Sequence, residues 1–195
     1  MRRQIILTGV GGQGLISMGR ILGEALLERG FKVRVAEVHG LAQRGGSVIV
    51  HVKYGDEDLS PTIPRGTADL FVSLELLEAA RNIAYLGRGG ALIVNDLILP
   101  PPAAAEIPSR SALLSFFGRL DAECYLVEAS EAARRLGSAL FTNTVMLGVL
   151  AESGMLNLTP LDLERSLRKV ITRFREKNVE AFRLGRKLWL QRKRL

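Results

Sequence analysis

The chain has 195 residues, a formal net charge of +7, 47% apolar residues and one cysteine. This length and composition are typical of a soluble globular protein, and we expect a single domain over residues 1–195. The lone Cys124 excludes a disulfide within the chain and an iron–sulfur cluster built from this chain alone. The longest uncharged run, 136–151, has 16 residues, fewer than a membrane-spanning helix needs. The apolar stretch after Met1 soon reaches glycine, which excludes a signal peptide, so we expect a cytoplasmic protein with no membrane partner.

The first forty residues are predicted to form a strand, a helix and a second strand. Residues 4–8 are a short apolar run rich in isoleucine, typical of a buried strand. Residues 14–29 carry an apolar stripe at helical spacing and end at Gly30, and 31–38 again resemble a strand. A strand–helix–strand unit of this kind normally places its two strands parallel.

The remaining chain continues this alternation. The further expected strands are 47–54, 69–74, 91–95 and 123–127, and the further expected helices are 76–86, 130–136, 140–152 and 160–190. An exposed loop begins at Pro100. The pattern predicts a Rossmann-like three-layer α/β/α sandwich with a mostly parallel or mixed sheet and a long C-terminal helix.

Two asparagines interrupt otherwise apolar helical stripes. Asn143 lies on the helix predicted over 140–152, and Asn178 lies between Phe174 and Phe182 on the last one. A buried amide needs hydrogen-bond partners, so each is either satisfied in the core or reaches a functional crevice. For Asn178, a helix break or a solvent-facing position is an equal alternative.

A glycine-rich turn, Gly9-Val10-Gly11-Gly12-Gln13-Gly14, joins the first strand to the first helix. Backbone N–H groups at such a helix start suit a phosphate or carboxylate. The turn matches the dinucleotide-binding pattern, and Glu37 follows Gly14 by 23 residues, where a ribose-binding acid is expected. Leu15 stands where a phosphate-binding P-loop requires lysine, which excludes that motif. A tight turn without any ligand is the other alternative.

A second polar and glycine-rich cluster follows the second strand. Its candidate binding residues are Glu37, His39, Gly40, Gln43, Arg44, Gly45 and Gly46. Side chains just beyond the carboxyl end of a strand lie where open α/β sheets bind ligands. We therefore expect these residues to line a crevice together with Gly9, Gly11, Gly12, Gln13 and Gly14. No catalytic acid, base or metal ligand can be assigned among them.

Three motifs together resemble the gamma-type domain of the 2-oxoacid:ferredoxin oxidoreductases. They are the turn at 9–14, Glu-Val-His-Gly-Leu-Ala-Gln-Arg-Gly-Gly-Ser-Val at 37–48, and Glu-Lys-Asn-Val-Glu-Ala-Phe at 176–182. The resemblance covers nearly the whole chain and, at this length, is greatest to the small beta subunits of the indolepyruvate branch. It implies a part in the coenzyme A-dependent oxidative decarboxylation of a 2-oxoacid, such as indolepyruvate or another arylpyruvate, to an acyl-CoA, with electrons passed to ferredoxin.

The same resemblance implies that the cofactors lie on another subunit. The sequence has no Gly-Asp-Gly segment followed by paired asparagines that would hold the metal of thiamine diphosphate. We therefore expect thiamine diphosphate, Mg²⁺ and iron–sulfur clusters on a larger partner subunit, and no cofactor on this chain alone. The two glycine-rich loops would line the crevice at the subunit interface and meet the phosphates of coenzyme A.

Two alternatives belong to other functional classes. The first is a self-sufficient NAD(P)-binding Rossmann protein that uses Glu37. The second is a nucleic-acid binder, because residues 165–195 carry +10 and leave −3 for the rest. The apolar stripe within this basic segment, together with Trp189, favours a packed helix with a solvated basic face, which could also steer an acidic partner, so we expect no nucleic-acid partner.

Overall fold

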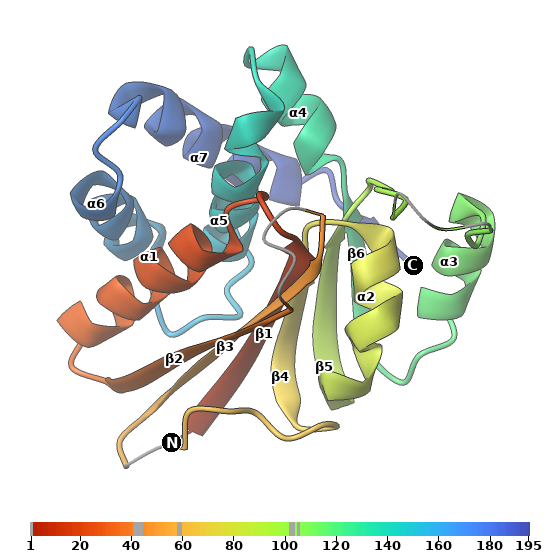
Figure 1. Cartoon of the computed structure of the whole chain (residues 1–195). Coiled ribbons are helices and arrows are strands. Elements are labelled where there is room, and N and C mark those ends of the chain that lie inside the picture. Colours follow the sequence, from red (N-terminus) through yellow and green to blue (C-terminus); the bar gives the residue numbers. More distant parts are fainter. Residues whose placement is uncertain (1, 41–44, 58–59, 102–103, 105) are drawn as a thin grey trace.

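The computed structural model describes residues 2–40, 45–57, 60–101, 104 and 106–195. Within these residues the chain forms one seven-stranded sheet with helices on both faces (Figure 1). The strands are β1 (Arg2–Val10), β2 (Lys32–His39), β3 (Ser47–Gly55), β4 (Ala68–Ser73), β5 (Leu86–Asn95), β6 (Glu123–Val127) and β7 (Lys193–Arg194). The α-helices are α1 (Leu15–Glu28), α2 (Leu76–Asn82), α3 (Arg110–Phe117), α4 (Ala129–Arg135), α5 (Thr142–Glu152), α6 (Pro160–Val170) and α7 (Arg175–Trp189). Two short 3₁₀ turns, η1 (Ile83–Tyr85) and η2 (Ala139–Phe141), precede β5 and α5.

The sheet is mixed, with the strand order β2-β3-β1-β4-β5-β6-β7. Strands β1, β4, β5 and β6 are parallel, whereas β3 pairs antiparallel with both β1 and β2, and β7 pairs antiparallel with β6. The first two strands therefore run in the same direction, as expected, but β3 lies between them. In a strand–helix–strand unit with adjacent strands, the end of β2 would lie next to the glycine-rich turn. Here β3 separates the two.

Alternate residues along each strand enter two separate cores. On one face, β1 side chains such as Ile5 and Leu7 pack with Val50 and Val52 of β3 against α1 and the helices α4 to α7. On the other face, Ile6 and its neighbours pack against α2 and α3. The predicted three-layer α/β/α fold with a mixed sheet is confirmed.

Helices α5 and α7 approach so closely that they touch through their backbones. A Cβ atom built on Gly148 would lie 1.9 Å from the Phe182 carbonyl oxygen, and one on Gly185 would lie 1.9 Å from the Val145 carbonyl oxygen. Only glycine leaves room for this contact. Helix α5 is buried around its whole circumference, which explains its long uncharged sequence. None of the helices among the described residues is long and apolar enough to span a membrane.

Three sequence predictions differ from the structure. The single helix predicted over 160–190 is two helices, α6 and α7, because the chain turns at 171–174, where Phe174 has a left-handed conformation. Helix α3 lies in the region predicted as a loop, and the strand predicted from Ala91 begins at Leu86. The predicted start of the helix at 160 is confirmed, with Thr159 and Asp162 forming a capping box before and after Pro160.

Candidate functional site

The glycine-rich turn after β1 is held in shape by the side chain of Gln13. The Val10 N–H donates to Gln13 Oε1 over 2.7 Å, and Gln13 Nε2 donates to the Leu74 carbonyl oxygen over 3.4 Å. Gly12 and Gly14 have φ angles of +99° and +81°, which L side chains rarely adopt. Gln13 thus ties the turn to the end of the neighbouring parallel strand β4.

The two glycine-rich loops meet through their backbones. The Gly11 N–H donates to the Gly46 carbonyl oxygen over 2.8 Å, and the Gly45 N–H donates to the Gly11 carbonyl oxygen over 3.5 Å. The first hydrogen bond has ideal length and the second is at the limit for an N–H donor. The residues that lead into β3 are therefore hydrogen-bonded to the middle of the turn after β1.

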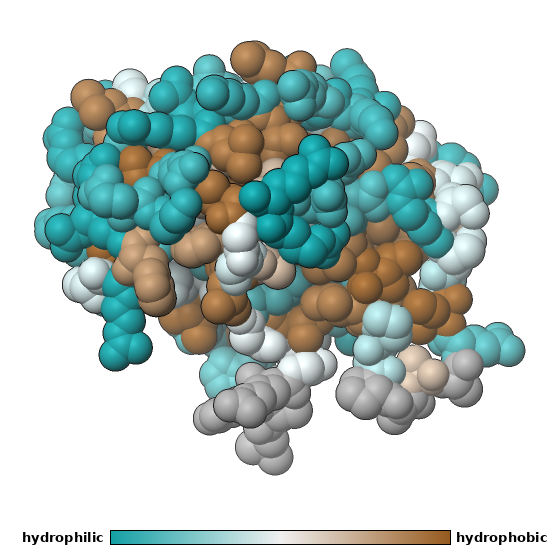
Figure 2. All heavy atoms as spheres, turned by 90° about the horizontal axis from the view of Figure 1, so that it is seen from above, coloured by the Kyte–Doolittle hydropathy of each residue, from teal (hydrophilic) through white to brown (hydrophobic). Residues whose placement is uncertain are grey.

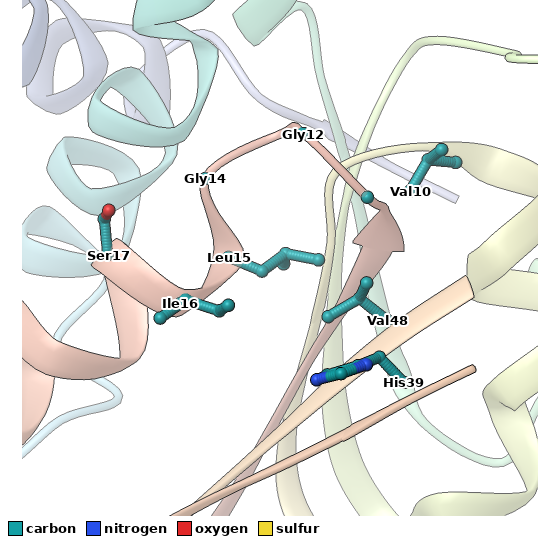
Figure 3. A pocket seen from close by; sticks show the side chains of 9 residues that line it. Val10, Gly12, Gly14, Leu15, Ile16, Ser17, His39 and Val48 are labelled. Atoms are coloured by element: carbon teal, nitrogen blue, oxygen red, sulfur yellow. The ribbon is translucent and has the colours of Figure 1, made fainter. Parts of the chain in front are cut away.

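A cavity of about 440 Å³ lies between the glycine turn, the start of α1 and the end of β2. It is lined by Val10, Gly11, Gly12, Gly14, Leu15, Ile16, Ser17, His39 and Val48. Figure 3 shows the ring of His39 and the side chains of Leu15 and Val48 directed into the same space. No side chain caps the start of α1, so its first N–H groups are available to an anion.

A second cavity, of about 350 Å³, lies on the other side of the same turn. It is lined by Gly12, Gln13, Gly14, Leu97, Leu99, Ser130, Arg134, Ser138, Ala139, Leu140, Thr142 and Asn143. Asn143 Nδ2 donates to the Gly14 carbonyl oxygen over 3.3 Å, and a Cβ on Gly14 would lie 2.3 Å from that nitrogen. Asn143, on the apolar helix α5, therefore reaches the crevice.

The third sequence motif connects to the glycine turn through Asn143. The Thr144 hydroxyl lies 3.4 Å from Asn143 Oδ1 and donates to Asn178 Oδ1 over 2.8 Å. Asn178 Nδ2 in turn donates to the Phe174 carbonyl oxygen over 3.1 Å. Of the alternatives for Asn178, the structure supports a buried amide with partners, and the helix break lies before it. A line of polar contacts thus runs from the turn at 9–14 to the start of α7.

A buried polar cluster beneath the glycine loops was not found from the sequence. Glu78 accepts hydrogen bonds from the Ser47 hydroxyl and from Asn82 Nδ2, and forms an ion pair with Arg81. Asn82 also donates to the Thr8 hydroxyl over 3.0 Å. Glu78 and Asn82 stand four residues apart on one face of α2, a spacing that could have indicated the cluster. The cluster attaches the first residue of β3 to α2.

Glu75, immediately before α2, is fully buried. Its carboxylate accepts from the N–H groups of Leu77, Glu78 and Leu99. Burial raises the pKa of Glu75 above its ordinary value, whereas the hydrogen bonds from Leu77, Glu78 and Leu99 act in the opposite direction. These contacts make Glu75 the N-cap of α2 and connect it to the loop after β5.

The predicted site residues divide into three groups. The turn residues Gly11, Gly12 and Gly14 line the first cavity together with His39, and Gln13 lines the second. The residues Gly9, Glu37, Gly40, Gly45 and Gly46 line neither cavity. Gln43 and Arg44 lie outside the described residues.

The position of Glu37 does not support the dinucleotide-binding alternative. Glu37 lies on β2, the outermost strand, and pairs with Val50 of β3. A ribose-binding acid belongs on the strand next to β1, and here that position is taken by the antiparallel strand β3. The glycine pattern is therefore not accompanied by the strand arrangement that the NAD(P) alternative requires.

The described residues contain no group of three or more histidine, cysteine, aspartate or glutamate side chains placed to bind a metal ion. Cys124 is buried in β6, where burial raises the pKa of its thiol.

The fold and the joined loops define an α/β domain with a glycine-rich crevice at the carboxyl edge of its parallel strands. Residues 4–188 match the model of the pyruvate ferredoxin/flavodoxin oxidoreductase family, and the chain belongs to this family. It is 37% identical to the indolepyruvate oxidoreductase subunit IorB of Pyrococcus horikoshii, over 93% of each chain. The family expected from the three motifs is confirmed.

Solved structures show the same fold. The gamma subunit of a keto/oxoacid ferredoxin oxidoreductase from Geobacter sulfurreducens superimposes with a TM-score of 0.72 at 23% identity, covering 97% of this chain and 99% of that one. The 2-oxoglutarate:ferredoxin oxidoreductase of Magnetococcus marinus, solved with 2-oxoglutarate, coenzyme A and succinyl-CoA, matches with a TM-score of 0.74 at 22% identity. That match covers this whole chain but only 32% of the other. The fold thus occurs both as a separate subunit and as part of a longer chain.

Proposed function

We propose that this chain is the small subunit, without cofactors of its own, of a 2-oxoacid:ferredoxin oxidoreductase, and that its substrate is indolepyruvate or another arylpyruvate. The observation that carries the proposal is the 37% identity to an indolepyruvate oxidoreductase subunit over 93% of both chains. Identity to the 2-oxoglutarate synthase subunit KorC of Methanothermobacter marburgensis is lower, at 29%. This difference supports an aryl rather than a dicarboxylic substrate.

The reactive cofactors belong to a larger partner subunit in this proposal. The single cysteine cannot hold an iron–sulfur cluster, and the described residues contain no group of three or more histidine, cysteine, aspartate or glutamate side chains placed for a metal ion; both observations support cofactors on the partner. In the Magnetococcus marinus enzyme the equivalent fold is 32% of a longer chain, which supports a close association with the remaining parts. The complete enzyme would convert the 2-oxoacid and coenzyme A to an acyl-CoA and reduce ferredoxin.

The crevice around the glycine turn is the part of this chain that would face the partner. Its rim carries three exposed apolar side chains, those of Ile16, Leu99 and Leu140, the last 81% exposed. Figure 2 shows hydrophobic side chains gathered across the middle of the face seen from above. Exposed apolar groups of this kind support a protein interface. The uncapped start of α1 would accept a phosphate of coenzyme A, with His39 beside it.

Anaerobic co-production with the larger subunit encoded by the same organism tests the proposal. We expect a brown, thiamine-containing complex that reduces ferredoxin only with indolepyruvate and coenzyme A both present. The small chain alone should show no such activity, and the larger subunit alone should be strongly impaired. Full oxidation by the isolated small chain, or no association between the two subunits, would contradict the proposal.

A further inference from the structure

The turn between α6 and α7 holds an aromatic side chain in an unfavourable backbone conformation. Phe174 has φ and ψ angles of 50° and 38°, and no other non-glycine residue among those described has a positive φ. An L-residue is disfavoured in this left-handed region, whereas glycine adopts it readily. The Phe174 side chain is nevertheless 76% exposed, so its ring adds little to the core. Stability of the isolated chain therefore does not explain a phenylalanine at this position.

The neighbouring core holds Phe174 in this conformation. Its carbonyl oxygen accepts from both the N–H and the Nδ2 of Asn178, over 3.0 and 3.1 Å. Asn178 Nδ2 also lies 3.4 Å from the Arg173 carbonyl oxygen. Asn178 is itself buried and accepts from the Thr144 hydroxyl. Strained residues that the surrounding structure holds in this way concentrate at functional sites.

The two residues beside Phe174 add uncompensated positive charge. Arg173 and Arg175 are exposed, and no carboxylate among the described residues pairs with either. The Arg175 guanidinium instead donates to the Ile171 carbonyl oxygen over 3.2 Å. Most other cations of the basic C-terminal segment do have partners. These include Arg168, Lys177, Arg183, Arg186, Lys193 and Arg194. Arg173 and Arg175 therefore place unpaired positive charge on both sides of the exposed ring.

We propose that residues 173–175 are an anchor that docks this chain onto an acidic surface of the cofactor-bearing subunit, with the Phe174 ring in an apolar pocket between carboxylates. The proposal rests on the function proposed above. Aromatic and arginine side chains dominate the binding energy of protein interfaces, and the flanking cations select a negatively charged partner. The polar contacts from Phe174 through Asn178, Thr144 and Asn143 to Gly14 connect this anchor to the crevice. Because the anchor is connected to the crevice, we infer that its partner is the subunit that completes the crevice, and not an electron carrier that binds transiently.

Substitution of Phe174 by glycine separates docking from folding. The F174G chain should be at least as thermally stable as the wild type, because glycine relieves the backbone strain. Its affinity for the larger subunit, measured by titration calorimetry or surface-immobilised binding, should fall about tenfold or more. F174A should show the same loss of affinity without the gain in stability. L190A removes another exposed apolar side chain and should change neither quantity.

Charge reversal tests the chemistry of the partner. The double variant R173E/R175E should bind the larger subunit more weakly, and its affinity should depend less on salt concentration than that of the wild type. R88E, which reverses an exposed cation near the start of β5, is the matched control and should bind normally.

The outcomes distinguish this inference from the proposed function. If wild-type chain and larger subunit do not associate, both fail. If they associate and F174G binds as tightly as the wild type, only the anchor is wrong. Dimerisation of the isolated chain that F174G abolishes would show that the ring contacts a second copy, and would also overturn the proposal.

Discussion

The backbone N–H of Gly11 donates a hydrogen bond to the carbonyl oxygen of Gly46 over 2.8 Å. Thirty-five positions separate these residues, and the contact joins the turn after β1 to the segment that leads into β3. The crevice depends on this junction, because the first cavity is lined both by the turn and by His39 at the end of β2.

Gln13 should stabilise the glycine turn more than an ordinary surface glutamine would. Gln13→Ala removes the acceptor for the Val10 N–H and the donor to the Leu74 carbonyl oxygen. We expect the free energy of unfolding to fall by about 1–2 kcal/mol, and amide exchange at Val10 to accelerate. Urea unfolding and hydrogen exchange measure these effects. Gln191→Ala, at an exposed position near the C-terminus, should leave both unchanged.

Glu78 should control the position of the loop that enters β3. Glu78→Ala leaves Ser47, Asn82 and Arg81 without their shared acceptor, and should cost about 2–4 kcal/mol of stability. Glu78→Gln keeps one oxygen acceptor and should cost less. Exchange at Gly11 and at 45–47 should rise in the same order.

Glu180→Ala is the control for the Glu78 variants. It removes an exposed carboxylate paired with Lys177, and should change stability by no more than about 0.5 kcal/mol. Equal effects of the two alanine substitutions would show that the buried cluster has no special role.

The contact between α5 and α7 should tolerate no side chain at Gly148. Gly148→Ala places a Cβ 1.9 Å from the Phe182 carbonyl oxygen, so the helices must separate. We expect a loss of about 3 kcal/mol or more, seen as a lowered Tm in calorimetry or as failure to fold. Gly40→Ala is the comparison, because no atom of the described residues lies within 4 Å of a Cβ there and its φ is not positive. A Gly148→Ala protein with unchanged Tm would contradict the close approach.

His51 should make stability depend on pH below neutrality. The side chain is buried on the α2 face, and its Nδ1 accepts from the Ile63 N–H over 3.1 Å. Burial, and to a smaller extent the charge of Lys53, lowers the pKa of His51 below its ordinary value of 6.5. The unfolded state therefore binds the proton more readily, and the free energy of unfolding should decrease as the pH falls below 6.5.

Urea unfolding at several pH values checks the His51 prediction. His51→Gln, which cannot take up the proton, should flatten the dependence between neutral and mildly acidic pH. An identical decrease in the variant and the wild type would assign the effect to other groups.

Apolar periodicity predicted most elements of the fold because it reports which side of each element is buried. The strand expected over 47–54 is β3, whose Val48, Val50 and Val52 enter the core against α1. Periodicity does not report which strands are neighbours, so the insertion of β3 between β1 and β2 was not predicted. The apolar stripe across 160–190 also continues through Phe174, and therefore conceals the turn between α6 and α7.

The candidate site was predictable only where its residues form local motifs. The glycine pattern at 9–14 and the polar run at 37–47 stand out in the sequence, and the structure brings Gly11 and Gly46 into contact. The cluster of Thr8, Ser47, Glu78 and Asn82 comes from three separate segments. The spacing of Glu78 and Asn82 indicates only the part of the cluster on α2, and the tertiary arrangement is needed to add Thr8 and Ser47.

The place of β3 in the sheet has a consequence for how the chain folds. Strand β1 pairs with β3 over Arg2–Val10 and Ser47–Gly55, and therefore must wait until α1 and β2 have been synthesised and a long loop has closed. The glycine turn can acquire its partner at Gly46 only in that late step. We expect refolding experiments to show that the Gly11 amide gains protection from hydrogen exchange only after most helical structure has formed.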